Sequence, residues 1–289
     1  MRYAMIEVNP TCPNRCSLCL PVVCKSGATM ILDDVRLLAD NLKAARVSCV
    51  TLAGFGNPVD HPHYRKVVDM IMSRLDCEIT VTCRVADIDR AAYRVYRVHP
   101  SVNSIEDAKM LADYIGFHYS RTRRDVAIAP HVVLTDQNAT SVGKMLGVLE
   151  PVAAEISRIS FACAVVLAPH EGHINAIRKA NGKRSKKAWA SLTAFALRQG
   201  NKSPWHDKIT IHRPDRIQTE HCQWPRSGIY INANLDVLPC CYKPMERPFG
   251  NIRETPLWRI WEQDMKRFCD GGWKSTTMCR ACPDIGGRL

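Results

Sequence analysis

Three cysteines in the segment TCPNRCSLCL have a spacing that suits a metal cluster. Cys12, Cys16 and Cys19 form the pattern CxxxCxxC directly after a short apolar stretch. A cluster of four irons and four sulfides needs one protein ligand for each iron, and cysteine thiolate is the usual ligand. Three thiolates would leave one iron open to chelate a small molecule. Zinc binding and simple burial of the thiols are the alternatives for the same residues.

A second group of cysteines near the carboxyl end could surround a metal completely. These residues lie in the stretches HCQWPRSGIYINANLDVLPCC and FCDGGWKSTTMCRACPD. The candidate ligands are Cys222, Cys240 or Cys241, Cys279 and Cys282. Four thiolates that end in CxxC suit either zinc or an iron–sulfur cluster, so the first cysteine motif decides the choice in favour of iron.

Composition and charge limit the class of protein. The 289 residues include 14 cysteines, 46% are hydrophobic, and the formal net charge is +12. No apolar run approaches the ~20 residues that a membrane span needs, and Arg2 and Glu7 bracket a run too short for a signal peptide. We therefore expect a cytoplasmic protein with no membrane partner, whose reduced thiols hold metal or take part in catalysis. Much of the basic charge is scattered, which disfavours nucleic acid as a partner.

Short strands alternate with helices over the first 170 residues. Strands are predicted at 3–8, 49–52, 77–85, 91–98, 126–134 and 159–167. Apolar residues at helical spacing predict helices in LDDVRLLADNLKAA, HYRKVVDMIMSRL, SIEDAKMLADYIG and SVGKMLGVLEPVA. We expect a short direct connection only between the third and fourth strands. The alternation predicts an α/β fold with a parallel sheet, in which ligands gather at the carboxyl ends of strands.

The character of the sequence changes near Gly200. The helical segment AWASLTAFALRQG ends there, and the remaining residues contain turns with Pro and Trp and six of the 14 cysteines. We therefore predict one domain at residues 1–200 and a second, metal-binding domain at residues 201–289.

The cysteine loop resembles that of the radical S-adenosylmethionine (SAM) family. In that family the open iron of a 4Fe-4S cluster binds the amino and carboxylate groups of SAM, and the fold is a partial (β/α)6 barrel. The segment TLAGFGNPVDHP is similar to the family's Gly-Gly-Glu-Pro segment, with His61 and Pro62 in their expected places. The resemblance implies that SAM contacts the following residues: Gly54, Phe55, Gly56, Asn57, Pro58 and, in the cysteine loop, Leu18.

Three of these positions depart from the family's pattern. Asn57 stands where Glu is common and could hydrogen-bond the methionyl amine through its carbonyl oxygen. Phe55 replaces a Gly, and Leu18 replaces the aromatic residue that usually precedes the third cysteine and contacts the adenine. These departures affect the details of cofactor contact and leave the cluster ligands in place.

The carboxyl-terminal cysteines resemble the auxiliary-cluster domains of the same superfamily, called SPASM in the long form and twitch in the short form. The family's DGxVxPC is similar to NLDVLPC, which implies that Cys240 is the ligand, although Leu235 stands where Gly is usual. Only seven residues follow Cys282, too few for a second auxiliary site. We therefore expect one auxiliary 4Fe-4S cluster, in addition to the cluster that binds SAM.

The resemblance implies reductive cleavage of SAM, followed by removal of a hydrogen atom from a substrate carbon by the 5′-deoxyadenosyl radical. An external one-electron donor such as flavodoxin or ferredoxin would reduce the cluster. The auxiliary cluster could then accept an electron, giving oxidation, or a thiol could return hydrogen to the opposite face, giving epimerisation. Cys241 and Cys269 are the candidate catalytic thiols, with burial as structural thiols the alternative for both.

The implied substrate is a small polar metabolite. The cysteine spacing is similar to that of aminocyclitol dehydrogenase members, and related members epimerise aminoglycosides, which points to a sugar, aminocyclitol or aminoglycoside of antibiotic biosynthesis. The absence of a leader-binding domain before Tyr3 favours this substrate class over a peptide. Polar candidates near strand ends are Arg84, Arg94, Arg97, His99, His131 and His170.

Two other functions compete with this one. A maturase of ribosomal peptides shares every motif named above. A zinc-stabilised basic RNA-binding protein, with RKANGKRSKK as its electrostatic contact, is the alternative from another class.

Overall fold

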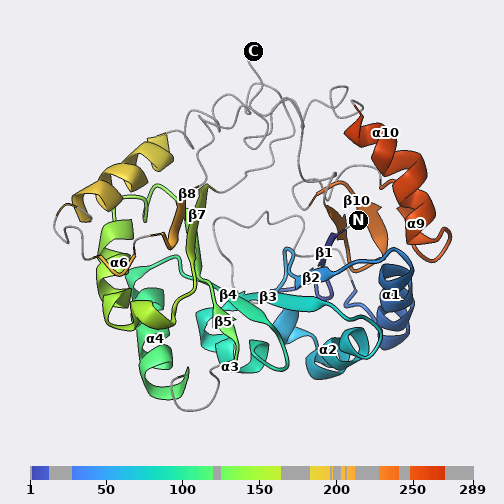
Figure 1. Ribbon diagram of the computed structural model, residues 1–289, viewed down its shortest axis with the longest axis horizontal. Coiled ribbons are helices and arrows are strands. Elements are labelled where there is room, and N and C mark those ends of the chain that lie inside the picture. Colours follow the sequence, from blue (N-terminus) through green and yellow to red (C-terminus); the bar gives the residue numbers. More distant parts are fainter. Residues whose placement is uncertain are drawn as a thin grey trace. The chain divides into compact units, whose positions relative to one another are not determined.

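A computed structural model describes residues 2–12, 28–119, 125–163, 183–195, 197, 203–205, 207–211, 228–240 and 248–270 (Figure 1). The chain divides into two compact units, which are treated separately below. Unit 1 comprises Met1–Thr82, Tyr93–Val95 and Gln218–Leu289, and unit 2 comprises Cys83–Ala92 and Tyr96–Ile217. The two domains predicted along the chain, at 1–200 and 201–289, stay a prediction.

The sheet of unit 1 combines strands from both ends of the chain. It contains β1 (Tyr3–Ile6), β2 (Cys49–Leu52), β3 (Glu78–Arg84), β9 (Gly228–Ile231), β10 (Asp236–Leu238) and β11 (Gly250–Asn251). Strands β2 and β9 flank β1 and run parallel to it, and Tyr3 lies opposite both Cys49 and Gly228. Strands β10 and β11 continue the sheet in antiparallel fashion. The segment that carries the carboxyl-terminal cysteines therefore shares a sheet with the strand that precedes the first cysteine motif.

Two amphipathic helices of unit 1, α1 (Leu32–Ala44) and α2 (Tyr64–Met72), lie next to each other (Figure 1). Helix α1 buries Val35, Leu38, Ala39 and Leu42, which recur at helical spacing. Near the end of the described chain, α9 (Leu257–Ile260), a π-helical turn (Trp261–Met265) and α10 (Lys266–Cys269) follow one another. None of the described helices is long and apolar enough to span a membrane.

Unit 2 is built on parallel strands with helices between them. Its strands are β4 (Arg97–Ser101), β5 (Ala127–Ile128), β6 (His131–Leu134), β7 (Ile159–Cys163) and β8 (Ile209–Ile211). Helices α4 (Ile105–Tyr114) and α6 (Val142–Leu149) pack side by side (Figure 1). A capping box between Ser104 and Asp107 fixes the start of α4.

The residues of β4 alternate between a buried face and a half-buried face of the strand. Val98 and Pro100 are buried, whereas Arg97, His99 and Ser101 are half-buried. This alternation is the expected pattern of a strand with one face on the apolar core.

One predicted strand is wrong in its position. Residues 91–98 were expected to be extended, but α3 (Ile88–Ala91) occupies the start of this range and β4 begins at Arg97. The buried residues Ile88, Ala91, Ala92 and Val95 are spaced as on one face of a helix. The connection between the third and fourth strands is therefore helical as well.

The strands predicted at 3–8, 49–52 and 77–85 and the four predicted helices are present within a few residues of their expected bounds. The strand predicted at 159–167 begins as expected with β7, and its last four residues lie outside the described ranges. The strand predicted at 126–134 is wrong in part: the structure has two short strands there, β5 and β6, separated at Pro130, which has no N–H to donate to a neighbouring strand.

Candidate functional site

The predicted cluster loop begins and ends at one point of unit 1. The backbone N–H of Met30 donates to the carbonyl oxygen of Val8 at 3.0 Å, and the Thr29 hydroxyl donates to Asn9 Oδ1 at 3.1 Å. The half-buried Cys12 lies at this base. The predicted residues Cys16, Leu18 and Cys19 lie outside the described residues, but both ends of the loop that carries them are hydrogen-bonded to each other.

The predicted SAM segment packs directly on the entry to this loop. A Cβ atom on Gly56 would lie 2.0 Å from the carbonyl oxygen of Asn9 and 2.6 Å from the carbonyl carbon of Pro10. The backbone N–H of Asn57 donates to the carbonyl oxygen of Thr11 at 3.1 Å. Only glycine permits this close approach of two backbones, so position 56 is fixed by its contact with the residues that precede Cys12.

Glu7 fixes the other half of the segment. Its Oε1 accepts a hydrogen bond from the backbone N–H of Phe55 at 2.7 Å, and a Cβ atom on Gly54 would lie 2.6 Å from the same oxygen. Burial raises the pKa of Glu7, and hydrogen bonds from backbone N–H groups, first that of Phe55, oppose that rise. Because the donors include the N–H of Ala233, one buried carboxylate ties the end of β1 to the SAM segment and to the residues after β9.

Both backbone groups of Asn57 are engaged within the protein. Its carbonyl oxygen accepts from Asn9 Nδ2 at 2.9 Å and from the N–H of Asp60 at 3.0 Å, where a 3-10 turn (Pro58–Asp60) begins with the predicted residue Pro58. A carbonyl oxygen has two lone pairs, so both are used. Any contact of Asn57 with a cofactor must therefore come from its side chain.

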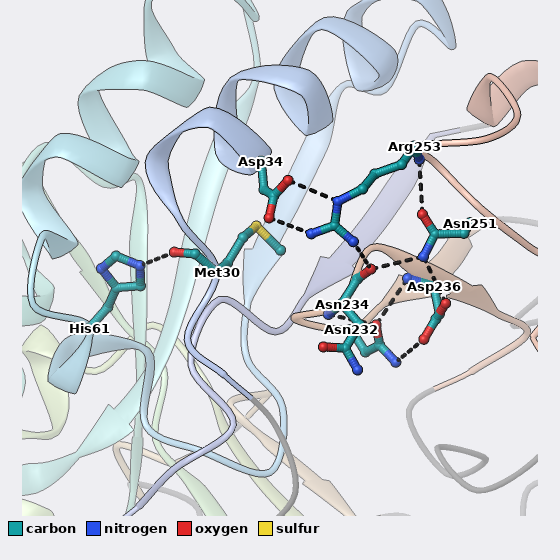
Figure 2. Close-up of polar contacts among 8 residues, drawn as sticks. All are labelled: Met30, Asp34, His61, Asn232, Asn234, Asp236, Asn251 and Arg253. Carbon is teal, nitrogen blue, oxygen red and sulfur yellow. Dashed lines mark hydrogen bonds and ion pairs between the residues drawn. The ribbon is translucent and has the colours of Figure 1, made fainter.

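His61 anchors the exit of the loop as a neutral imidazole (Figure 2). Its Nδ1 accepts from the backbone N–H of His63 at 2.9 Å, so Nε2 carries the proton and donates to the carbonyl oxygen of Met30 at 2.8 Å. Burial lowers the pKa of His61, which keeps this tautomer neutral.

The predicted auxiliary site is described only in part. Cys240 lies two residues after β10 and is half-buried, and Cys269 ends α10. The other predicted residues, Cys222, Cys241, Cys279 and Cys282, lie outside the described ranges. Consistent with this, the described part of the chain contains no group of three or more potential metal ligands.

The hairpin that leads to Cys240 shows why glycine is usual at position 235. Leu235 has φ = 68°, in the left-handed region that glycine occupies without steric cost. Its N–H donates to the carbonyl oxygen of Asn232, and the N–H of Asn232 donates to the carbonyl oxygen of Asp236. This is a tight turn followed by a residue in the left-handed conformation, a common hairpin connection. Leu235 is fully buried, so its side chain contributes apolar burial despite its backbone strain.

An ion pair joins this hairpin to helix α1 (Figure 2). The Arg253 guanidinium makes two hydrogen bonds to the Asp34 carboxylate, at 3.1 and 2.5 Å, and a third to the carbonyl oxygen of Asn234 at 2.9 Å. The same carbonyl oxygen accepts from Asn251 Nδ2 at 2.9 Å. Because α1 begins shortly after the cluster loop, the carboxyl-terminal hairpin is bonded to the helix that follows that loop.

The predicted polar candidates near strand ends that the structure describes belong to both units. Arg84 pairs with Asp87 in unit 2, and Arg94 forms an exposed ion pair with Asp69 in unit 1. His170 lies outside the described residues.

Three of these candidates lie in the strands of unit 2. His99 and Arg97 belong to β4, and His131 belongs to β6. Burial lowers the pKa of both histidines to about 4. Ser101 Oγ lies 3.2 Å from His131 Nε2. Because His131 is neutral, this nitrogen can accept the hydroxyl proton in a hydrogen bond.

Comparison with known proteins identifies the carboxyl-terminal part. Residues 222–283 match the SPASM family model, which describes an iron–sulfur cluster-binding domain. The carboxyl-terminal part of the chain is therefore similar to SPASM domains. This match favours iron over zinc at the second cysteine group. No curated protein matches the sequence.

Of the three solved structures named here, the two with TM-scores above 0.5 share the fold of this chain. The structure of anSMEcpe with bound AdoMet and Kp18Cys peptide has a TM-score of 0.68 at 13% identity, over 98% of this chain and 88% of that one. Streptococcus suis SuiB bound to precursor peptide SuiA has a TM-score of 0.66 at 15% identity, over 99% and 71%. BtrN in complex with AdoMet and 2-DOIA has a TM-score of 0.48 at 13% identity, over 100% and 95%.

These matches confirm the predicted fold class, an α/β partial barrel with a carboxyl-terminal iron–sulfur SPASM domain. The chain thus shares the fold of anSMEcpe and SuiB and matches the SPASM model over residues 222–283. The cofactors predicted from the sequence, 4Fe-4S clusters and SAM, agree with the SPASM match and with the AdoMet in the anSMEcpe structure.

Two residues of the site were not identified from the sequence. Glu7 and Asn9 are 5% and 2% exposed and hold the base of the loop together. A signal for them is present in the sequence, because polar side chains at positions 7 and 9 alternate with the apolar Val8 directly after the apolar strand β1. A buried polar side chain needs hydrogen-bond partners, but the partners of Glu7 and Asn9 include residues 29, 55 and 57, which only the fold brings close.

Proposed function

We propose that the protein is an enzyme that cleaves SAM reductively and removes a hydrogen atom from a carbon of its substrate. The observation that carries the proposal is the packing of Gly56 on the backbone of Asn9 and Pro10. It joins the predicted SAM segment to the base of the loop with Cys12, Cys16 and Cys19. When bound, the cluster and SAM supply electron transfer and hydrogen-atom abstraction.

The described residues of unit 1 act by positioning. Glu7 holds the backbone of Phe55, and His61 holds the exit of the loop through Met30. The Asn57 backbone is bonded to the loop entry, so we assign its side chain to the methionyl amine of SAM. In the same scheme Gly54 and Pro58 shape the segment, and Leu18 and Phe55 contribute apolar contact.

The SPASM domain is proposed to hold one auxiliary 4Fe-4S cluster on Cys222, Cys240, Cys279 and Cys282. Thiolate ligands for all four irons would leave no open iron for a substrate. Such a cluster suits electron transfer, and an external donor such as flavodoxin or ferredoxin is proposed to reduce the SAM-binding cluster.

We propose a small polar metabolite as the substrate, namely a sugar, aminocyclitol or aminoglycoside that is oxidised or epimerised in the cytoplasm. The support is the sequence resemblance in the spacing of the carboxyl-terminal cysteines. Cys241 or Cys269 would return the hydrogen atom in an epimerisation. A peptide is the second candidate substrate, because anSMEcpe and SuiB, which share the fold, are solved with bound peptides.

Anaerobic purification tests the proposed chemistry. We expect a brown protein with about eight irons per chain that releases 5′-deoxyadenosine from SAM under reducing conditions. The Cys16→Ala variant should lose this release, whereas Cys49→Ala, at the amino end of β2, should retain it. A colourless protein with zinc, or wild-type release from Cys16→Ala, contradicts the proposal.

A solvent-deuterium experiment separates the reaction types, with aminocyclitols, aminoglycosides and short peptides as trial substrates. Deuterium fixed at the product carbon, and lost in Cys241→Ala or Cys269→Ala, indicates epimerisation. A product that lacks two electrons and carries no solvent label indicates oxidation. Turnover of peptides alone would contradict the metabolite substrate.

A further inference from the structure

Asn9 is a buried amide that bonds three segments of unit 1. Its Nδ2 donates to the carbonyl oxygens of Thr11 at 3.0 Å and Asn57 at 2.9 Å. Its Oδ1 accepts from the hydroxyls of Thr11 at 2.9 Å and Thr29 at 3.1 Å. Every donor and the acceptor of this side chain are therefore used, although only 2% of the residue is exposed.

The three segments are the ones on which the proposed cofactor site depends. Thr11 directly precedes Cys12, Thr29 lies at the exit of the cysteine loop, and Asn57 belongs to the SAM segment. Asn57 is 48 residues away from Asn9 along the chain. One side chain thus sets the loop entry, the loop exit and the SAM segment relative to one another.

The hydrogen bonds of the Asn9 side chain require a primary amide on a side chain of this length. Two donors and one acceptor must be presented at one point, and among the short side chains only asparagine provides both. Aspartate would place a second acceptor oxygen against two carbonyl oxygens, and serine offers a single hydroxyl. A buried polar group left without its partner is costly.

We propose that Asn9 is a positioning residue for SAM binding. It holds the SAM segment at the position, relative to the cysteine loop, where one SAM molecule can contact both the segment and the open iron. The inference rests on the proposed function. Asn9 acts through Thr11, Thr29 and Asn57, and its own side-chain groups are all used within the protein.

Unit 2 contains a matched control residue. Asn138 is also buried, and its Nδ2 donates to the carbonyl oxygens of Asn103 at 3.0 Å and Val133 at 2.9 Å. Its Oδ1 accepts from the N–H of Thr135 at 2.8 Å. Asn138→Asp therefore makes the same chemical change in a network that contains neither a predicted cluster ligand nor the SAM segment.

The test compares Asn9→Asp, Asn9→Ser and Asn138→Asp in the full chain, reconstituted without oxygen. Equilibrium dialysis with SAM gives the affinity, iron analysis gives cluster content, and hydrogen exchange reports the amide of Asn57. We expect Asn9→Asp to bind SAM at least about tenfold more weakly and to exchange the Asn57 amide faster. Asn9→Ser should fall between Asn9→Asp and wild type, and Asn138→Asp should bind SAM as wild type does.

The outcomes distinguish this inference from the proposed function. If wild type binds SAM and Asn9→Asp binds it equally well, or if Asn138→Asp is weakened as much, the positioning role is wrong and the proposed function stands. If wild type binds no SAM, both are wrong. Should Asn9→Asp fail to fold, the Asn9→Ser variant decides by the same measurements.

Discussion

The two units use the same device at the carboxyl ends of their strands, with different results. In unit 1 the Asn9 amide joins the residues after β1 to residues 29 and 57. In unit 2 the Asn138 amide joins the turn after β6 to the residue that follows β4 by two positions. Both amides are buried and bonded. A buried amide at strand ends therefore occurs in both units. We propose a functional role only for Asn9, because the loop that it closes carries the predicted metal ligands.

Individual glycines of the two units differ in the space around them. In unit 1 a Cβ atom on Gly54 or Gly56 would collide with neighbouring atoms at 2.6 and 2.0 Å. In unit 2 a Cβ atom on Gly147 would make an ordinary contact with Phe195 at 3.7 Å. Gly56 thus marks a backbone contact between the loop entry and the SAM segment. Gly147 has room for a methyl group, unlike Gly143 of the same helix, whose Cβ atom would lie 2.7 Å from the carbonyl oxygen of Ser191.

The largest predicted effect comes from Gly56→Ala. The new methyl group would meet backbone atoms, which no change of rotamer can move, so we expect destabilisation of about 3 kcal/mol or more and loss of SAM-dependent activity. Urea unfolding and iron content measure the result. The control Gly147→Ala lies inside α6 and should stabilise the protein by about 0.5–1 kcal/mol. Equal effects of the two substitutions would contradict this contrast between Gly56 and Gly147.

The sequence predicted the elements better than the contacts between them. The strand–helix alternation, the cysteine loop and the SAM segment were predicted because periodicity and spacing are local signals. The helix at Ile88–Ala91 was missed because a short apolar run with few residues supports either structure. Glu7 and Asn9 were missed because their partners are about 20 to 50 residues away. The pairing of β9 with β1 likewise joins residues more than 200 positions apart, and no local pattern predicts such a contact.

A second prediction concerns Leu235, whose strain and burial oppose each other. Leu235→Gly relieves a left-handed backbone that costs roughly 1 kcal/mol, but it removes a buried side chain worth about 2–5 kcal/mol. We therefore expect net destabilisation of about 2 kcal/mol in urea unfolding. Leu134→Gly in β6 of unit 2 removes an equally buried leucine from an extended strand and should cost more. If the two variants lose the same stability, the strain at Leu235 is not significant.

A third prediction concerns the response of unit 2 to pH. Burial lowers the pKa of His99 and His131 from 6.5 to about 4. Between these values the unfolded chain binds more protons than the folded protein, so the free energy of unfolding falls as the pH falls from 6.5 toward 4. His131→Gln should remove roughly 1–2 kcal/mol of this pH dependence. Urea unfolding at pH 7.5 and 5 measures the change, and an unaltered difference between the two pH values would contradict it.

The smallest predicted effect is at the ion pair between the hairpin of unit 1 and α1. Asp34 is 13% exposed and Arg253 48% exposed, so solvent screens the pair only in part. Arg253→Lys keeps the charge but cannot keep the two parallel hydrogen bonds, and we expect a loss of about 0.5–1 kcal/mol that shrinks at high salt.

The control for this pair lies on the same helix. Arg36 and Asp33 are 55% and 79% exposed and share one contact of 3.1 Å, so Arg36→Lys should cause no measurable change. Urea unfolding of both variants at low and high salt tests the difference. Because Arg253 also donates to the carbonyl oxygen of Asn234, its variant should in addition speed hydrogen exchange of the Leu235 amide. If the Leu235 amide exchanges faster in Arg253→Lys alone, the ion pair stabilises the hairpin that leads to Cys240. If it exchanges at the same rate in Arg253→Lys and Arg36→Lys, the ion pair of Arg253 does not stabilise the hairpin.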